Sequence, residues 1–325
     1  MTVVSDAMDA RAESRRGVMY ALLAYGLWGF YGLFFGAIVH IPLFEIVAHR
    51  AFWSVPVALG VLWALGKLSD VALVLADRRL VVRLLLTSFF VAVNWTVMVW
   101  AVSVDRTLEA SLGYYINPLL NVVIGFFLLN ERLTPPQVVA VAIAAVAVAV
   151  QTLLAGVFPW VALVLAASFA TYGYLRKTMP IGPVQGFLVE ALVLSVIGVG
   201  IVAWLGWQSE MRFGASTSDT LLLIAAGPMT ALPLMWFAAA ARRIRLGTLG
   251  LLQYIAPSGL FLTAILVFGE PLDGWGLATF VLIWVALAIY SAEALRIDRG
   301  AQRRAKARAT ESDAAAARGL RGPAS

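Results

Sequence analysis

The sequence contains no cysteine, and it contains only two histidines, His40 and His49, among its 325 residues. A chain without thiols forms no disulfide, carries no cysteine nucleophile and cannot ligate zinc or an iron–sulfur cluster through cysteine. Two histidines do not make a histidine-rich metal site. The patterns GxxxxGK(S/T), HExxH and GxSxG, each of which supports a specific enzyme chemistry, are also missing. We therefore expect no enzyme activity, no metal and no cofactor.

Charge is scarce as well, because only 13% of the residues are charged while 62% are hydrophobic, and the mean hydropathy is +0.88. A membrane-spanning helix needs about 20 mostly apolar residues. Ten segments have this length and composition, at 17–39, 43–66, 80–104, 108–130, 136–155, 158–178, 183–206, 220–241, 246–268 and 274–295. The alternating pattern that membrane strands require is missing. The sequence predicts an all-α integral membrane protein with ten transmembrane helices.

The positive charges are distributed unevenly along the chain. If the N-terminus is inside, only Arg106 and Arg212 of the 24 Lys and Arg residues fall in outside connections, and Arg50 lies within a helix. Cytoplasmic loops carry the excess of Lys and Arg, so both termini are predicted to be cytoplasmic. Residues 1–16 are predicted to form a polar cytosolic leader, and residues 296–325 a basic, disordered tail. This tail is expected to meet anionic lipid headgroups rather than nucleic acid.

Two segments of the chain resemble each other. The stretch LGYYINPLLNVVIGFFLLNERL, at 112–133, matches LLQYIAPSGLFLTAILVFGEPL, at 251–272, with a proline and a glutamate at the same spacing in both. Earlier helices repeat at a similar shift, so residues 17–156 and 157–295 are predicted to be two copies of five spans each. An odd number of spans inverts the second copy in the membrane. Inverted repeats are typical of carriers with a substrate site near the midplane and alternating access.

The prolines of the repeated stretch, Pro118 and Pro257, cannot donate a backbone hydrogen bond, which leaves the carbonyls of Tyr114 and Gln253 free. Free carbonyls are tolerated in a membrane where the helix lines a wet cavity. Two further polar side chains, Asn117 and Asn121, lie one turn apart on the face of Tyr114. We therefore predict two helix kinks at a cavity wall. The alternative is a packing kink in which asparagines bridge helices.

Charged side chains inside spans are a second signal, because each costs about 2.5–3.5 kcal/mol at bilayer depth and is therefore paired, hydrated or functional. The second span contains Glu45, His49 and Arg50, and the seventh contains Glu190. Arg50 is suited to an anionic group of a substrate, and the other three are predicted to couple protons to transport. An ion pair between Arg50 and a glutamate is the structural alternative. The remaining predicted substrate-binding residues, besides Tyr114, Asn117 and Asn121, are Asn94, Trp95, Gln253 and Tyr254. Two other glutamates, Glu131 and Glu270, follow helix ends and are expected to stabilise the next helix N-terminus.

Several ordered polar motifs resemble those of a known family. These are AHRAFWS at 48–54, NWTVMVWAV at 94–102, EASLGYYINPL at 109–119, LLIAAG at 222–227, AAARRIRLGTLG at 239–250 and LGLLQYIAP at 249–257. They are similar to the EamA family of the drug/metabolite transporter superfamily, over residues 17 to about 298. The resemblance implies ten helices in two inverted halves, and transport of small metabolites or drugs. It identifies neither a substrate nor site residues.

The sequence therefore predicts an exporter of a small molecule in the bacterial cytoplasmic membrane, whose partners are its substrate and membrane lipid. Two alternatives from other classes stay open. One is an intramembrane enzyme or accessory subunit acting on lipid, and the other is a membrane scaffold that does not transport. The sequence does not indicate an oligomeric state.

Overall fold

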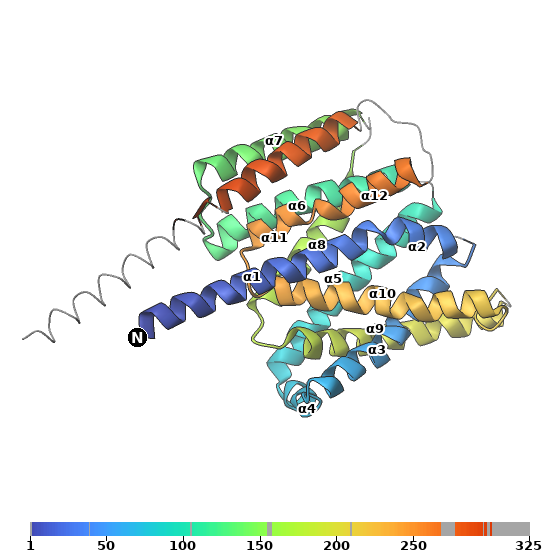
Figure 1. The fold of residues 1–325 in the computed structure, drawn as a ribbon. Helices are drawn as coiled ribbons and strands as arrows, with labels where there is room; N and C mark the ends of the chain where they lie inside the picture. Colours follow the sequence, from blue (N-terminus) through green and yellow to red (C-terminus); the bar gives the residue numbers. More distant parts are fainter. Residues whose placement is uncertain are drawn as a thin grey trace, which may run out of the picture.

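The apolar segments fold into helices that lie side by side (Figure 1). The structure is a computed structural model that describes residues 2–300 except 39, 105, 155–157, 209, 268–276, 295, 298 and 299. The helices are α1 Thr2–Gly29, α2 Tyr31–Ile38, α3 Leu43–Ala64, α4 Ser69–Ala76, α5 Arg78–Ser103, α6 Thr107–Leu129, α7 Pro135–Leu154, α8 Trp160–Thr178, α9 Pro183–Trp207, α10 Thr217–Ala241, α11 Leu246–Leu252 and α12 Ile255–Leu266. A further helix covers Leu277–Ala294. The described residues contain no strand beyond one isolated bridge between Phe213 and Ser216.

Each of the ten predicted segments contains a helix. Among the described residues, eight helices are long and apolar enough to cross a membrane, and Gly113–Leu129 is a shorter apolar helix. The first predicted helix is interrupted at Phe30, and the ninth at Gln253 and Tyr254. Helix α1 begins at Thr2 and so includes most of the predicted leader, while the apolar part long enough to cross a membrane begins at Ala12. Residues 301–325 of the predicted tail lie outside the described part of the chain.

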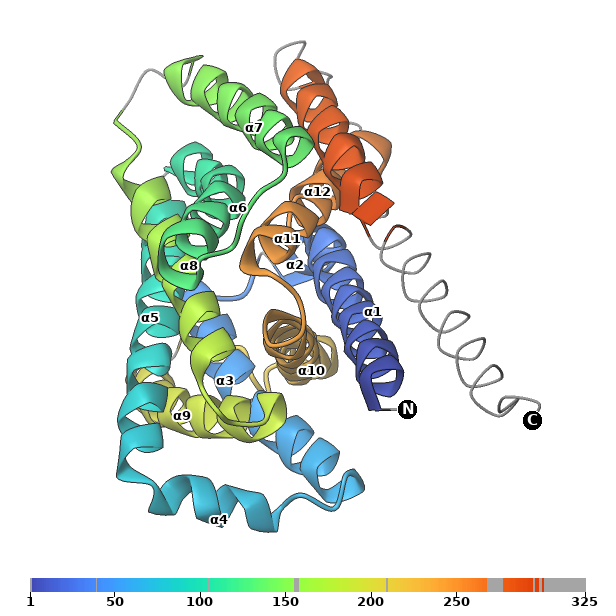
Figure 2. The same ribbon diagram turned by 90° about the vertical axis from the view of Figure 1, so that its left-hand side faces the viewer.

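The tenth helix in this numbering, α10, lies at the centre of the bundle, in contact with α1, α3, α8 and α9 (Figure 2). Aromatic side chains fill the space where α1, α8 and α10 meet. Their ring centroids lie 5.0–6.3 Å apart, at Tyr25, Trp28, Phe169, Tyr172 and Phe237. These spacings are those of favourable tilted and edge-to-face pairs. The core of a protein that lies in lipid is thus held by ring contacts and alanine-lined helix faces.

Contacts between connections show which of them share an end of the bundle. At one end, Arg243 pairs with Glu13 at 2.7 Å, and Gln185 donates to Asp70 at 3.1 Å. Lys177 donates to the carbonyl of Ala241 at the same end. We call this end, formed by connections 65–77, 130–134, 179–182 and 242–245, the basic end. The opposite end, which we call the far end, carries the bond between His40 and Asp219 at 2.8 Å.

The carboxylate of Glu131 joins two helices at the basic end. It accepts from the backbone N–H groups of Leu246 and Gly247 at 2.7 and 3.0 Å, and so caps the N-terminus of α11. The prediction that it would stabilise the helix directly after it is wrong. That helix, α7, begins with Pro135 and Pro136, which have no N–H to offer. The matching residue Glu270 lies outside the described residues.

Two glycines allow α1 and α12 to cross closely. A Cβ atom built on Gly259 would lie 2.7 Å from the Cα of Gly29, and one built on Gly29 would lie 3.2 Å from the Cα of Gly259. The first distance is shorter than real Cβ atoms show, and the second is tight. The two halves of the chain therefore touch backbone to backbone at this point.

Candidate functional site

The guanidinium of Arg50, on α3, lies between α5 and α10. Arg50 is the eighth residue of α3, which places it about 10 Å from the start of that helix at 1.5 Å per residue. Its Nε donates to Thr230 Oγ1 at 2.8 Å, and its guanidinium lies 4.6 Å from the centre of the Trp95 ring. The charge also acts on the phenols of Tyr31 and Tyr114. We call these five residues the Arg50 cluster.

The Arg50 cluster draws on five helices: α2, α3, α5, α6 and α10. Its members Tyr31, Arg50, Trp95 and Tyr114 come from the first predicted repeat, and Thr230 comes from the second. Tyr114 is 42% exposed, although it belongs to a helix of the bundle. The cluster therefore combines a cation, an indole face, a hydroxyl and two phenols at one place.

No carboxylate of the described residues lies within ion-pair distance of Arg50. The alternative of an Arg50–glutamate lock is therefore wrong for this structure. Arginine is charged at every relevant pH. The cluster accordingly holds a cation whose described partners, Thr230 and Trp95, are both neutral.

Glu190 is paired with a different arginine. Its carboxylate accepts from Thr87 at 2.7 Å and from Tyr172 at 3.2 Å, and it lies 3.6 Å from Nη1 of Arg176. Arg176 is only 1% exposed and also donates to the carbonyl of Pro183 at 2.7 Å. Glu190 is therefore paired within the protein, because Arg176 reaches back from the end of α8 into the bundle. Its role in proton coupling stays a prediction.

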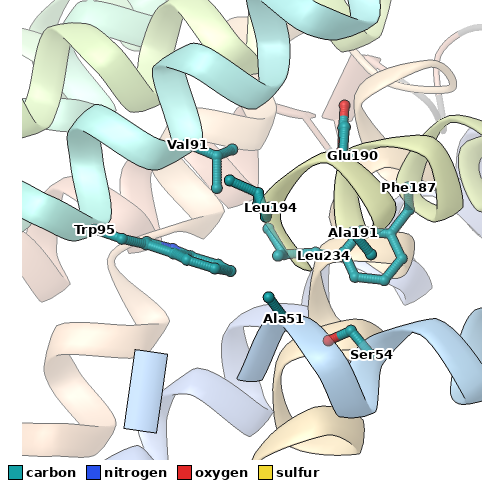
Figure 3. Close-up of a pocket in the computed structure, with 9 residues that line it drawn as sticks. All are labelled: Ala51, Ser54, Val91, Trp95, Phe187, Glu190, Ala191, Leu194 and Leu234. Carbon is teal, nitrogen blue, oxygen red and sulfur yellow. The ribbon is translucent and has the colours of Figure 1, made fainter. Parts of the chain in front are cut away.

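A small cavity of about 10 Å³ lies between α3, α5, α9 and α10 (Figure 3). That volume is comparable to one water molecule. Nine residues line it, namely Ala51, Ser54, Val91, Trp95, Phe187, Glu190, Ala191, Leu194 and Leu234. Figure 3 shows the carboxylate of Glu190 directed away from the other lining side chains. Trp95 is the residue shared by this cavity and the Arg50 cluster.

The two predicted proton-coupling residues of α3 contact the connection between α9 and α10. Glu45 is fully buried and accepts from the backbone N–H groups of Arg212 and Phe213 at 2.8–3.0 Å. His49 stacks on the Phe213 ring at 4.5 Å, and its Nδ1 accepts from the indole N–H of Trp53 at 3.1 Å. His49 Nε2 and Glu45 Oε1 lie 4.0 Å apart, which is beyond hydrogen-bond distance. Glu45 instead fixes the loop at the far end.

The predicted asparagine and glutamine residues join three helices. Asn117 donates to the carbonyl of Ala166 at 2.8 Å, and Asn121 donates to Asn117 and to Gln253 at 3.1 and 3.2 Å. These bonds connect α6, α8 and α11, as the alternative of bridging asparagines describes. Asn94 likewise donates to Leu165 and Ser168 of α8. Contact of these residues with a substrate stays a prediction.

The predicted kinks differ from each other in the structure. Pro118 lies inside the continuous helix α6, and the hydroxyl of Tyr254 donates to the neighbouring carbonyl of Tyr115 at 3.0 Å. Pro257 lies in the first turn of α12, after the break. The prediction that the carbonyl of Gln253 is free is wrong, because this carbonyl accepts from the N–H of Ala256 at 3.0 Å in that break.

Sequence reasoning missed a third proline that shapes the site. Pro233 lies inside α10, and its missing N–H leaves the carbonyl of Met229 without the usual helical donor. The hydroxyl of Tyr31 donates to that carbonyl. A proline frees the carbonyl four residues before it, so Pro233 would have pointed to Met229 in the same way that Pro118 pointed to Tyr114. The identity of its donor required the fold.

Several long apolar helices that enclose a charged, hydrogen-bonded cluster define a multi-pass membrane protein. Comparison with known proteins gives the family: the chain belongs to the EamA-like transporter family, whose profile matches residues 15–153, and is a RarD-type member of it. This confirms the family resemblance and a location in the bacterial membrane.

Three relatives illustrate the similarity. The chain is 43% identical to an uncharacterized transporter of Pseudomonas aeruginosa, over 88% of this chain and 97% of the relative. It is 41% identical to Protein RarD of Streptomyces exfoliatus, over 93% and 96%. It is 33% identical to the Chloramphenicol-sensitive protein RarD of Pseudomonas aeruginosa, over 80% and 88%. Three of the relatives are named as transporters.

A solved crystal structure shares the fold. It superposes with a TM-score of 0.68 over 86% of this chain and 97% of that chain, at 20% sequence identity. At this identity the likeness extends to the helix arrangement alone.

Proposed function

We propose that this protein is a secondary transporter that exports a small metabolite or drug across the bacterial cytoplasmic membrane by alternating access. Its ten helices form two inverted halves, and both termini are cytoplasmic. The observation that carries the proposal is the composition of the Arg50 cluster, which takes Arg50, Trp95, Tyr31 and Tyr114 from one half and Thr230 from the other.

A cluster assembled from both halves is sensitive to their relative movement. Alternating access moves one repeat against the other around a site near the midplane. The Arg50–Thr230 bond at 2.8 Å is a contact between α3 and α10 that such a movement would make or break. A site confined to one half would keep its contacts in every state and would not couple binding to movement.

Four observations support the inverted halves and the topology. Helices α6 and α11 begin at Thr107 and Leu246, which are equivalent positions in the sequence repeat. Ser54 and Ser195, also equivalent, each donate to the carbonyl four residues earlier. The family match over residues 15–153 covers the first half. The basic end collects most of the described Lys and Arg residues, as expected for the cytoplasmic side.

The test begins with ligand-induced thermal stabilisation of the purified protein, because any compound that binds the folded state raises its melting temperature. The panel contains amino acids, nucleosides, aromatic acids and chloramphenicol, the last because one relative is named for sensitivity to it. Stabilising compounds are then tested for flux in proteoliposomes, and for uptake into inside-out vesicles to establish export. Flux of at least one compound is expected. A folded protein that binds compounds but moves none of them would instead fit the enzyme or scaffold alternatives.

A further inference from the structure

We propose that the Arg50 cluster is the binding site for the carboxylate of a small organic acid, and that the transported substrate is therefore a monoanion. This inference rests on the proposed transport function and adds the chemical class of the cargo. It follows from the donors that Arg50 still offers, from the charge of the cluster and from the contrast with Arg176.

The donors of Arg50 are only partly used. A guanidinium carries five N–H groups, one on Nε and two on each Nη. Nε donates to Thr230, and the described residues provide no hydrogen-bond acceptor for either Nη. The Thr230 bond and the Trp95 ring at 4.6 Å hold the guanidinium in a fixed orientation. A planar guanidinium held in this way presents two parallel donors, which match the two oxygens of a carboxylate.

The charge of the cluster selects a monoanion. Arg50 is the single cation among its five residues, and Tyr31, Trp95, Tyr114 and Thr230 are neutral. One guanidinium neutralises one carboxylate, whereas a phosphate dianion would leave a negative charge inside the membrane. Uncompensated charge at bilayer depth is costly. The cluster therefore fits a carboxylate better than a phosphate.

The surrounding side chains complete a pocket for the rest of such a molecule. Tyr31 donates its hydroxyl hydrogen to the carbonyl of Met229, which fixes its ring beside Arg50. Tyr114 is 42% exposed and lies within range of the Arg50 charge. Its hydroxyl makes no hydrogen bond to the described residues and can donate to the bound acid.

A second deep arginine shows the contrast between a structural and a binding role. Arg176 is 1% exposed and lies 3.6 Å from the carboxylate of Glu190. The protein thus provides a carboxylate for the arginine that is sealed in the bundle. It provides none, among the described residues, for Arg50, which is only half-buried. The missing anion is supplied by the substrate.

The test uses the purified full-length protein and matched pairs of ligands that differ only in charge. Butyrate, phenylacetate and indole-3-acetate are compared with butyramide, phenylacetamide and indole-3-acetamide, and inorganic phosphate is added as a separate probe. At least one acid is expected to raise the melting temperature at a concentration where its amide does not. Arg50→Gln should abolish this shift, and Arg50→Lys should weaken binding at least tenfold because the bidentate geometry is lost.

The control variant is Arg106→Gln. Arg106 also stacks on tryptophan, with its guanidinium 5.7 Å from the Trp100 ring and 5.2 Å from the Trp160 ring, but it lies at the far end. This variant should retain the wild-type response to acids. Folding of Arg50→Gln is checked by its melting temperature without ligand and by its size-exclusion profile.

Four results would overturn the inference. They are equal stabilisation by acids and amides, an unchanged response in Arg50→Gln, a larger shift with phosphate than with any acid, or no shift with any acid. A neutral solute that is transported equally well by wild type and Arg50→Gln would overturn the carboxylate site while leaving the transport function intact. Binding of acids without flux would overturn the transport function while leaving the carboxylate site intact.

Discussion

The polar side chains of the interior are of two kinds: some bond to other protein groups and hold helices together, and others have hydrogen-bond donors that no described residue uses. Arg176 with Glu190, and Glu45 with the loop at the far end, have partners on protein atoms. Arg50 has only neutral partners among the described residues. This difference could not be read from the sequence, where Arg176 looks like one more positive charge at a helix end. The hydropathy of a segment shows that a charge is buried, but it does not show which opposite charge meets it.

The Arg176–Glu190 pair gives a stability prediction. Removal of one partner leaves an uncompensated buried charge, which typically costs about 3–5 kcal/mol. Arg176→Met and Glu190→Gln should each lower the melting temperature in detergent strongly. The double variant should recover part of the loss, because neither charge is then left alone.

The coupling role predicted for Glu190 gives a different pattern. If Glu190 carries a transported proton, Glu190→Gln should retain its stability and substrate exchange but lose accumulation driven by a pH gradient. Wild-type melting behaviour in Glu190→Gln would therefore contradict the structural pairing, and a pH-gradient assay in proteoliposomes would then decide the coupling role.

Tyr31 and Pro233 should be energetically coupled. Tyr31→Phe leaves the part-buried carbonyl of Met229 without a donor, at a cost of up to about 1–3 kcal/mol. Pro233→Ala returns an N–H to α10 that can take the same carbonyl. Tyr31→Phe should therefore cost much less in the Pro233→Ala background, as measured by a double-mutant cycle on unfolding free energies. Additive effects of the two changes would show that the hydroxyl acts elsewhere.

Among the helices, hydrophobic length predicted nearly every span but not the places where the chain bends. The predicted segment 246–268 reads as one continuous span, and the structure divides it into α11 and α12. Pro257 signalled a disturbance, but the break lies at Gln253 and Tyr254, ahead of the proline. The ring of a proline clashes both with the residue directly before it and with the preceding turn of the helix. Where that conflict is relieved depends on packing against α6, which local sequence does not encode.

The short helix α11 depends on a cap from another part of the chain. Glu131→Ala should free the N-terminus of α11, because its first two N–H groups lose their acceptor. A helix cap is worth about 0.5–2 kcal/mol. Hydrogen exchange measured by mass spectrometry should rise in residues 246–252.

A matched control for this change is Asp77→Ala. Asp77 accepts from the N–H groups of Arg79 and Leu80 at 2.8 and 3.2 Å, but it lies exposed and caps its own helix, α5. This variant should raise exchange only at the start of α5. Equal, unchanged protection of α11 in both variants would show that Glu131 does not hold it.

For the whole molecule, the clustering of Lys and Arg at one end of the bundle predicts the orientation in the membrane. Because the sequence has no cysteine, single cysteines can be introduced without background labelling. An impermeant thiol reagent added to intact cells should label Ser218→Cys at the far end, and should not label Ser69→Cys or Thr178→Cys at the basic end. Ser218 is chosen rather than its neighbour Ser216 because the side chain of Ser216 caps α10 and its replacement would disturb that helix. Labelling of position 69 from outside would reverse the proposed topology.

The crossing of α1 and α12 at Gly29 and Gly259 has a consequence for how the protein can evolve. A methyl group at Gly259 would collide with the backbone of Gly29, and one at Gly29 would push the backbone of Gly259 away by a few tenths of an ångström, so a larger residue at either position moves the helices. The sizes of two residues that are far apart in the sequence are therefore constrained together. We expect sequence drift to spare these two positions together, so that a lineage which enlarges one residue has also remodelled the contact between α1 and α12.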